Sequence, residues 1–179
     1  MSTEDAQDTI EGIETGDGGD ISTELFRRFE LFRGLTDEEL DRIAGLVTYC
    51  VYDSGEIVVE EGARSRALFI LLEGQVDVIK KDEGADRHLA TLGRDAIFGE
   101  LGLVLGKPRT ATVEASKRVD LLRLDGEKFT SLRGEHDLAA YKIEHNILTM
   151  LAERQASMNQ ELMSLMERAD GEGDGSDKI

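Results

Sequence analysis

The spacing of hydrophobic residues changes twice along this chain, and each change predicts a different kind of secondary structure. Over residues 22–46, apolar side chains recur at steps of three and four, which is the period of an amphipathic helix. Gly34 interrupts this pattern, and Thr36 with Glu39 has the spacing of a capping box at the start of a helix. The sequence therefore predicts helices ahead of the first strand.

From Thr48 to Leu124 the hydrophobic period shortens to two, which is typical of half-buried strands. The alternation is clearest at residues 76–78 and 119–124, and residues 83–86 read as a hairpin turn. Glycines separate the apolar stretches at short intervals: Gly55, Gly62, Gly74, Gly84, Gly93 and Gly99. This pattern predicts a mainly β fold, a small antiparallel β-barrel or jelly roll, with helices on either side of it in the sequence.

Helical spacing returns at Gly126, a candidate hinge, and continues to about Arg168. One stripe has steps of three and four, with Gln155 as its polar exception: Tyr141, Leu148, Leu151, Met158, Leu162 and Leu165. The stripe predicts either a two-stranded parallel coiled coil or a helix that folds back on its own domain. Self-association is favoured, because residues 162–166 lie too far beyond a small barrel to be covered by it.

These patterns divide the chain into four parts. Residues 22–134 should hold the helical lead-in and the barrel, and residues 135–168 a long C-terminal helix that acts as a lid or dimerises. The ends, residues 1–21 and 169–179, are rich in Gly, Asp and Glu and have few apolar side chains to bury. We therefore expect both ends to be disordered.

The formal net charge of −17 argues against several classes of function. Affinity for nucleic acid comes largely from Lys and Arg, so an acidic chain is not expected to bind it. The sequence has no apolar run long enough to span a bilayer and no signal peptide, so no membrane insertion is expected. A single cysteine, Cys50, fits a reducing cytoplasm and is expected to pack in the core.

Residues 98–113 carry the candidate chemistry. Gly99 and Glu100 stand at the start of a short apolar segment, and Arg109 follows nine residues after the glutamate. Backbone N–H groups at a helix N-terminus and a guanidinium can hold the same anion. A carboxylate there would repel an anion, so it is explained only if it accepts hydrogen bonds from hydroxyl groups. A nucleotide carries both the phosphate and the ribose hydroxyls.

The same run resembles the phosphate-binding cassette of the cyclic-nucleotide-binding domain family. That family includes protein kinase A regulatory subunits, cyclic-nucleotide-gated channels and bacterial catabolite activator proteins. Residues 53–62 and 69–78 resemble a turn and a hairpin of the same family, and the resemblance covers roughly residues 31–154. One departure is that residues 94–97 lack the Gly-Asp pair that often precedes the cassette phenylalanine.

The resemblance implies a role for each candidate site residue. Glu100 would accept from the ribose 2′-hydroxyl and Arg109 would bind the cyclic phosphate. Further contacts to the phosphate would come from the backbone N–H groups of Gly99, Leu101, Gly102 and Ala111. The hydroxyl of Thr110 would bind the phosphate or the purine edge. Val78 and Leu89 would form an apolar wall for the base, and Asn159 on the last helix would belong to a lid over the purine.

The sequence as a whole favours a non-catalytic, cytoplasmic sensor that binds cAMP, or cGMP, as its ligand. Ligand binding would rearrange the C-terminal helix, and an unidentified effector protein would bind differently as a result. The protein is expected to form a homodimer through the same helix. A cupin-type metal enzyme is disfavoured, since His88, His136 and His145 are far apart, and no metal is expected. A transcription factor is disfavoured because an acidic tail follows Arg168 directly. The alternative is an oligomerisation or partner-docking module with a degenerate nucleotide pocket.

Overall fold

The computed structural model describes residues 21–82 and 84–172 of the chain. Its helices are α1 (Thr23–Phe26), the 3₁₀ helix η1 (Glu30–Phe32), α2 (Asp37–Ala44), α3 (Glu100–Leu105), α4 (Gly126–Gly134) and α5 (Leu138–Glu172). Its strands are β1 (Val47–Tyr52), β2 (Ile57–Val59), β3 (Leu68–Glu73), β4 (Val76–Lys80), β5 (Arg87–Leu92), β6 (Ile97–Phe98), β7 (Thr112–Ala115) and β8 (Val119–Leu124). Helices thus precede, interrupt and follow the strands, as the sequence predicts.

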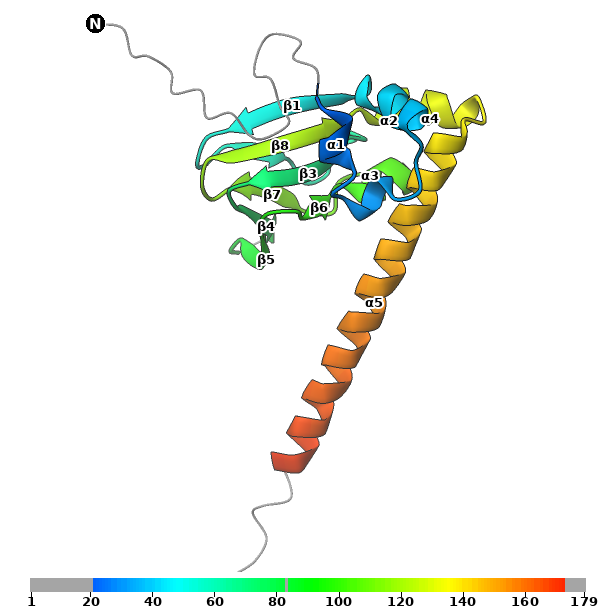
Figure 1. The fold of residues 1–179 in the computed structure, drawn as a ribbon. Helices are drawn as coiled ribbons and strands as arrows, with labels where there is room; N and C mark the ends of the chain where they lie inside the picture. The colour runs from blue at the N-terminus through cyan, green and yellow to red at the C-terminus, as the bar shows by residue number, and fades with distance from the viewer. Residues whose placement is uncertain (1–20, 83, 173–179) are drawn as a thin grey trace, which may run out of the picture.

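The strands form two antiparallel four-stranded sheets, which confirms the predicted jelly-roll architecture. The first sheet has the order β1-β8-β3-β6 and the second β2-β7-β4-β5. The hairpin predicted around residues 83–86 joins β4 to β5, where Val76 pairs with Leu92 and Lys80 with Arg87. The chain crosses repeatedly between the two sheets, for example from β3 to β4, so segments distant in the sequence become neighbours, as β1 and β8 do (Figure 1).

The first sheet lies between the helices and the second sheet, so both faces of its central strands, β8 and β3, are buried. Phe69 and Leu71 of β3 belong to the core between the sheets, whereas Leu68 and Ile70 belong to the core under the helices. This position explains why β3 is buried over five consecutive residues and why Leu121 and Leu122 of β8 are both buried. The strict in–out alternation predicted for residues 119–124 is therefore wrong at that step.

The helical regions also differ from the expectation in their extent. The predicted N-terminal helical stretch resolves into α1, η1 and α2, and only α2 is longer than four residues. Its capping box is confirmed, with Thr36 Oγ1 accepting from Glu39 N and Glu39 Oε2 accepting from Thr36 N. The last helix begins at Leu138 and continues through Glu172, four residues beyond the predicted end at 168. Disorder is predicted for residues 1–21 and 169–179; of these, residues 169–172 belong to α5, and residues 1–20 and 173–179 lie outside the described residues.

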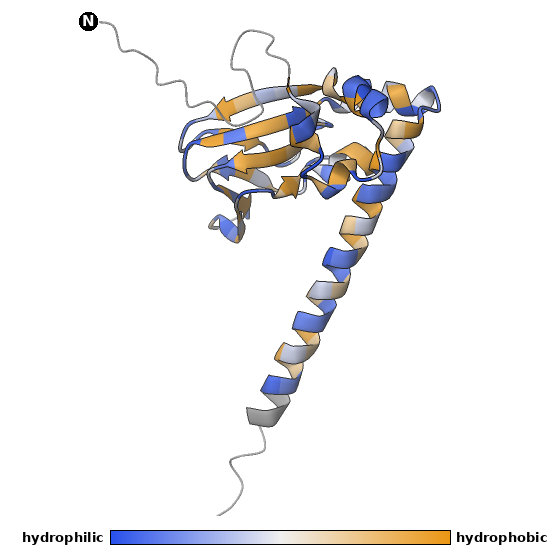
Figure 2. Ribbon diagram, in the orientation of Figure 1, coloured by the Kyte–Doolittle hydropathy of each residue, from blue (hydrophilic) through white to orange (hydrophobic). Residues whose placement is uncertain are grey.

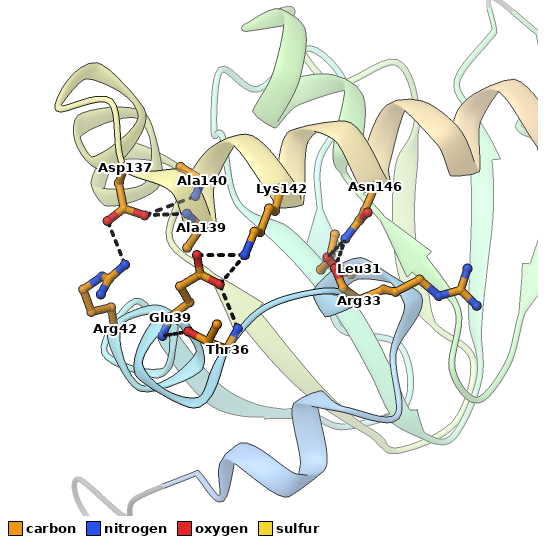
Figure 3. Close-up of polar contacts among 10 residues, drawn as sticks. All are labelled: Leu31, Arg33, Thr36, Glu39, Arg42, Asp137, Ala139, Ala140, Lys142 and Asn146. Carbon is orange, nitrogen blue, oxygen red and sulfur yellow. Dashed lines mark hydrogen bonds and ion pairs between the residues drawn. The ribbon is translucent and has the colours of Figure 1, made fainter.

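Polar contacts fix the base of α5 to the N-terminal helices (Figure 3). Lys142 Nζ donates to both carboxylate oxygens of the buried Glu39, at 2.9 and 2.7 Å. This hydrogen bond and that from Thr36 N hold the pKa of Glu39 below its usual value. Asn146 Nδ2 donates to two main-chain carbonyls of the η1 region, those of Leu31 and Arg33, each at 3.0 Å. The first turns of α5 are therefore anchored, while its far end projects away from the sheets (Figures 1 and 2).

Gly126 begins α4 at a point of very close packing. A Cβ atom at this residue would lie 2.0 Å from the carbonyl oxygen of Arg66. The start of the helix is also fixed by Asp125, whose side chain accepts from the backbone N–H groups of Glu127 and Lys128. Glycine is needed here for close approach of two backbones, which is a different reason from the hinge predicted from the sequence.

We predict that Gly126→Ala destabilises the protein by about 1–3 kcal/mol or more, because the backbone of α4 must move away from Arg66. Gly134→Ala is the matched control, since it lies in the same helix and its Cβ would meet nothing within 4 Å. That control should be neutral or stabilising by up to about 1 kcal/mol. Urea denaturation of both variants measures the difference, and equal effects would contradict this account of Gly126.

Candidate functional site

The candidate site forms where β6 leads into α3. Phe98 anchors β6 by stacking on Phe69 of β3, with the ring centroids 5.2 Å apart. Gly99 then takes a left-handed conformation with φ of +86°, which turns the chain into α3. Before β6, Asp95 adopts φ of +66°, so the turn at residues 94–97 keeps a left-handed residue even without glycine. The first N–H groups of α3 have no partner within the helix, which leaves them free to bind an anion.

Arg109 lies buried against this turn, with 6% of its surface exposed. Its Nε donates to Ser65 Oγ at 3.1 Å, its Nη1 donates to the carbonyl of Gly99 at 2.9 Å, and its Nη2 donates to the carbonyl of Ala67. A Cβ at Gly99 or at Gly102 would lie 2.6 or 2.9 Å from Nη1. Glycine at both positions is therefore what allows the guanidinium to lie against the start of α3.

All three hydrogen-bond acceptors of Arg109 are uncharged. A guanidinium has five N–H donors, so two remain after these three bonds. Burial lowers the pKa of Arg109, and the carboxylate of Glu100 raises it by acting through space. The group stays protonated, since arginine is not deprotonated in proteins. Within residues 21–82 and 84–172, no carboxylate binds this buried cation directly, which is an arrangement suited to an anionic ligand.

Glu100 is held by a residue of α5. Its side chain is 13% exposed, and its Oε1 accepts from Arg154 Nη1 at 3.0 Å. Arg154 Nη2 lies 3.5 Å from the carbonyl oxygen of Ile97. Between α5 and the start of α3 is a narrow hollow, lined by Ile97, Glu100, Ile147, Met150, Leu151 and Arg154. The carboxylate expected to bind the ligand is therefore also a contact between the cassette and the long helix.

Arg154 is a residue that the sequence interpretation missed. The face of α5 that packs on the domain runs through Ala140, Ile143 and Ile147, all buried. Continuing that face by steps of three and four reaches Met150 or Leu151 and then Arg154. The signal for Arg154 is thus a charged residue at the next position of a buried helix face. The neighbouring apolar stripe predicts self-association of α5 but does not predict this contact.

The other expected phosphate contacts lie next to Arg109. Thr110 is exposed, and its carbonyl accepts from Lys80 Nζ at 3.0 Å. Ala111 is half-buried, and Leu101 and Gly102 lie in the first turn of α3. The structure therefore brings Gly99 and Gly102 against the Arg109 guanidinium. Glu100 and Leu101 lie beside them in the first turn of α3, and Thr110 and Ala111 directly follow Arg109 in the chain.

The residues predicted to contact the base differ in burial, since Val78 is half-buried whereas Leu89 and Asn159 are exposed. Val78 is half-buried and packs against the core between the sheets. Leu89 lies where the pairing of β4 with β5 shifts register, between the pairs Val78–Ala90 and Ile79–His88, and it is 53% exposed. Asn159 is exposed on α5, five residues past Arg154, and its Oδ1 accepts from Gln155 at 3.2 Å. The hydrogen bond described for Asn159 is therefore within α5 and does not involve the cassette.

Three further findings concern the described residues. Among them, no group of three or more His, Cys, Asp or Glu side chains is placed to hold a metal ion. No described helix has both the length and the hydropathy needed to cross a membrane. Cys50 is half-buried in β1, and burial raises the pKa of its thiol.

Comparison with known proteins agrees with this geometry. Residues 49–136, which include both sheets' central strands and the whole cassette, match the family model of the cyclic nucleotide-binding domain. The chain belongs to this family. Over 109 residues it is 36% identical to a cGMP-dependent protein kinase of Toxoplasma gondii, covering 60% of this chain and 11% of that protein.

Two solved structures show the same fold. The catabolite activator protein of Thermus thermophilus is 29% identical, with a TM-score of 0.62 over 76% of this chain and 63% of that one. The regulatory domain of Toxoplasma gondii protein kinase A, solved with cAMP, is 26% identical, with a TM-score of 0.56 over 61% and 42%. The chain thus spans less than two thirds of each of these relatives.

We predict that Arg154→Ala accelerates amide hydrogen exchange in α5 around residues 150–156 while changing the free energy of unfolding by less than about 1 kcal/mol. The reason is that a half-exposed ion pair contributes little to global stability but is here the outermost contact described between α5 and the cassette. Glu153→Ala, an exposed neighbour, is the control. Exchange that is unchanged by Arg154→Ala would show that α5 is held by its apolar contacts alone.

Proposed function

We propose that this domain binds a 3′,5′-cyclic mononucleotide, cAMP or cGMP, and acts as a non-catalytic sensor. The observation that carries the proposal is the buried Arg109 guanidinium, held by three uncharged acceptors beside the free N–H groups of α3. The relatives support the ligand class, because one is named as cGMP-dependent and another was solved with cAMP. A slight preference for cAMP is the prediction from the sequence.

Each site residue has a role in this proposal. The two remaining N–H groups of Arg109 bind the cyclic phosphate, together with backbone N–H groups of α3 and of Ala111. Glu100 accepts from the ribose 2′-hydroxyl, since an ionised carboxylate can only accept. Val78 and Leu89 lie against the base, and the exposed Thr110 hydroxyl reaches either the phosphate or the purine edge.

The contact between Glu100 and Arg154 supports a route for the output signal. A ribose hydroxyl that binds Glu100 competes with Arg154 for the same carboxylate oxygens. Because the base of α5 is anchored by Lys142 and Asn146, the change affects the part of the helix beyond Leu151. A ligand shifts such an equilibrium only by binding the two states differently, and Arg154 gives the two states different contacts at the ligand site. The effector would contact the outer part of α5 and respond to its change in position.

The outer part of α5 supports a second element of the proposal, a homodimer. Leu148, Met158, Leu162 and Leu165 are between 51% and 59% exposed along one stripe. An exposed apolar stripe of this length marks an interaction surface, and its heptad spacing suits two parallel helices with Gln155 inside the seam. A second copy would also supply another Asn159 beyond the barrel. The domain would function in the cytoplasm, as the composition predicts.

Ligand binding tests the proposed function directly. We expect thermal stabilisation and a saturable calorimetric titration with cAMP or cGMP, with about 2.7 kcal/mol of added stability at roughly 100 times Kd. Arg109→Ala should weaken binding by about 2–5 kcal/mol, since it removes one partner of a buried charged contact. Lys107→Ala, an exposed cation two residues away, should change it little. Absence of binding to both nucleotides at millimolar concentration would favour the partner-docking alternative with a degenerate pocket.

The dimer is tested by charging its seam. Leu162→Glu with Leu165→Glu should give a monomer at tens of micromolar, where the wild type should sediment as a dimer. Both residues are exposed beyond the barrel, so the fold of the monomer should be unaffected, whereas Leu151 packs on the domain and is unsuitable. Ser157→Glu with Gln160→Glu places the same charge on the opposite face and should leave the dimer intact. A monomeric wild type would refute the dimer.

A further inference from the structure

The loop between β2 and β3 contacts Arg109 along both its main chain and its side chain, although it lies outside the cassette. Gly62 N donates to the carbonyl of Arg109, and Arg109 N donates to the carbonyl of Ala63, each at 2.9 Å. The same loop supplies Ser65 Oγ and the carbonyl of Ala67 to the guanidinium. The arginine is therefore positioned by a segment more than 40 residues upstream.

We propose that Ser65 is a positioning residue for the anion site, acting through Arg109. This inference rests on the proposed function. Two of the three acceptors of the guanidinium are main-chain carbonyls, of Gly99 and Ala67, and any side chain at those residues leaves a carbonyl in place. Ser65 provides the one side-chain acceptor among the three, and it holds Nε.

The Nε contact matters because it fixes the plane of the guanidinium. An arginine side chain has several rotatable bonds, and its N–H groups form a rigid planar fork. Ser65, Gly99 and Ala67 accept one hydrogen bond each from Nε, Nη1 and Nη2. These three bonds set the directions of the two N–H groups that remain, one on Nη1 and one on Nη2. A bidentate contact to a phosphate depends on those directions. Loss of the Ser65 contact lets the plane rotate and reduces the fraction of chains ready to bind.

Ser65 also leaves the charge of Arg109 available to the ligand. A hydroxyl is neutral, so it orients the guanidinium without neutralising it, and a serine that accepts from Nε keeps its own O–H as a further donor. Ser65 is an exposed residue, and its hydroxyl lies beside the guanidinium. The neighbouring sequence also favours an anion. Residues 62–67 contain Arg64 and Arg66, residues 106–109 contain Lys107 and Arg109, and neither range contains an acidic residue.

The test measures affinity for cAMP and cGMP in three variants. Ser65→Ala should bind about 10- to 150-fold more weakly, the usual effect of losing a hydrogen bond to a charged group. Ser65→Thr keeps the hydroxyl at an exposed position and should bind within about twofold of wild type. Ser54→Ala is the control, since that hydroxyl donates to the carbonyl of Ser116 and does not contact Arg109. Wild-type affinity in Ser65→Ala, or equal losses in Ser65→Ala and Ser65→Thr, would overturn the proposal.

A double-mutant cycle on unfolding, measured without ligand, separates this inference from the proposed function. If Ser65 acts through Arg109, Ser65→Ala should change the unfolding midpoint in the wild type but not in an Arg109→Met background. If no variant binds either nucleotide, the proposed function is wrong and the cycle alone decides: coupling supports the positioning of Arg109 by Ser65, and additivity overturns it.

Discussion

The rest of the candidate site depends on the burial of the Arg109 guanidinium among uncharged acceptors. Taking a cation out of water costs several kcal/mol unless hydrogen bonds and an opposite charge replace its hydration. Here the hydrogen bonds are provided by Ser65, Gly99 and Ala67, but a directly bound opposite charge is not among the described contacts of Arg109. The positive charge of Arg109 is thus available to an anionic ligand. The sharp turn at Gly99 places the N-terminus of α3 where that anion would lie.

The carboxylate of Glu100 connects this anion site to the long helix. Glu100 is next to the Gly99 turn, and its partner Arg154 comes from α5, 54 residues later. The base of α5 is tied to the N-terminal helices through Glu39 and Lys142, so the two ends of the helix experience different constraints. Changes at the ligand site are therefore expected to affect the outer half of α5, where the exposed apolar stripe lies. In the proposed function, the position of the helix and the occupancy of the pocket would be coupled through this one carboxylate.

Much of the architecture could be predicted from local sequence signals. Regularly spaced glycines and two-residue periodicity give the antiparallel sheets, and Thr36 with Glu39 gives the start of α2. What could not be predicted is burial on both faces of the first sheet, which makes Leu121 and Leu122 both core residues. Periodicity reports one face of a strand at a time, and the second covering layer becomes known only from the tertiary arrangement.

The candidate site shows the same division. Family resemblance places Glu100 and Arg109, because the cassette is a continuous motif. Ser65 and Arg154 come from segments 44 residues before Arg109 and 54 residues after Glu100, and no local pattern connects them to the cassette. The role expected of Asn159 depends on the position of the outer part of α5, which in one chain projects away from the sheets (Figure 1).

The most direct test of the central claim is an NMR titration that follows the side-chain Nε–H resonance of Arg109 as cAMP is added. The resonance is assigned by its loss in Arg109→Lys. The account predicts a separate, slowly exchanging Nε–H peak for Arg109 before ligand is added, since the group is buried and bonded to Ser65, and a saturable shift of that peak on binding. A ligand that binds without moving this resonance would show that the phosphate is held elsewhere and would contradict the account.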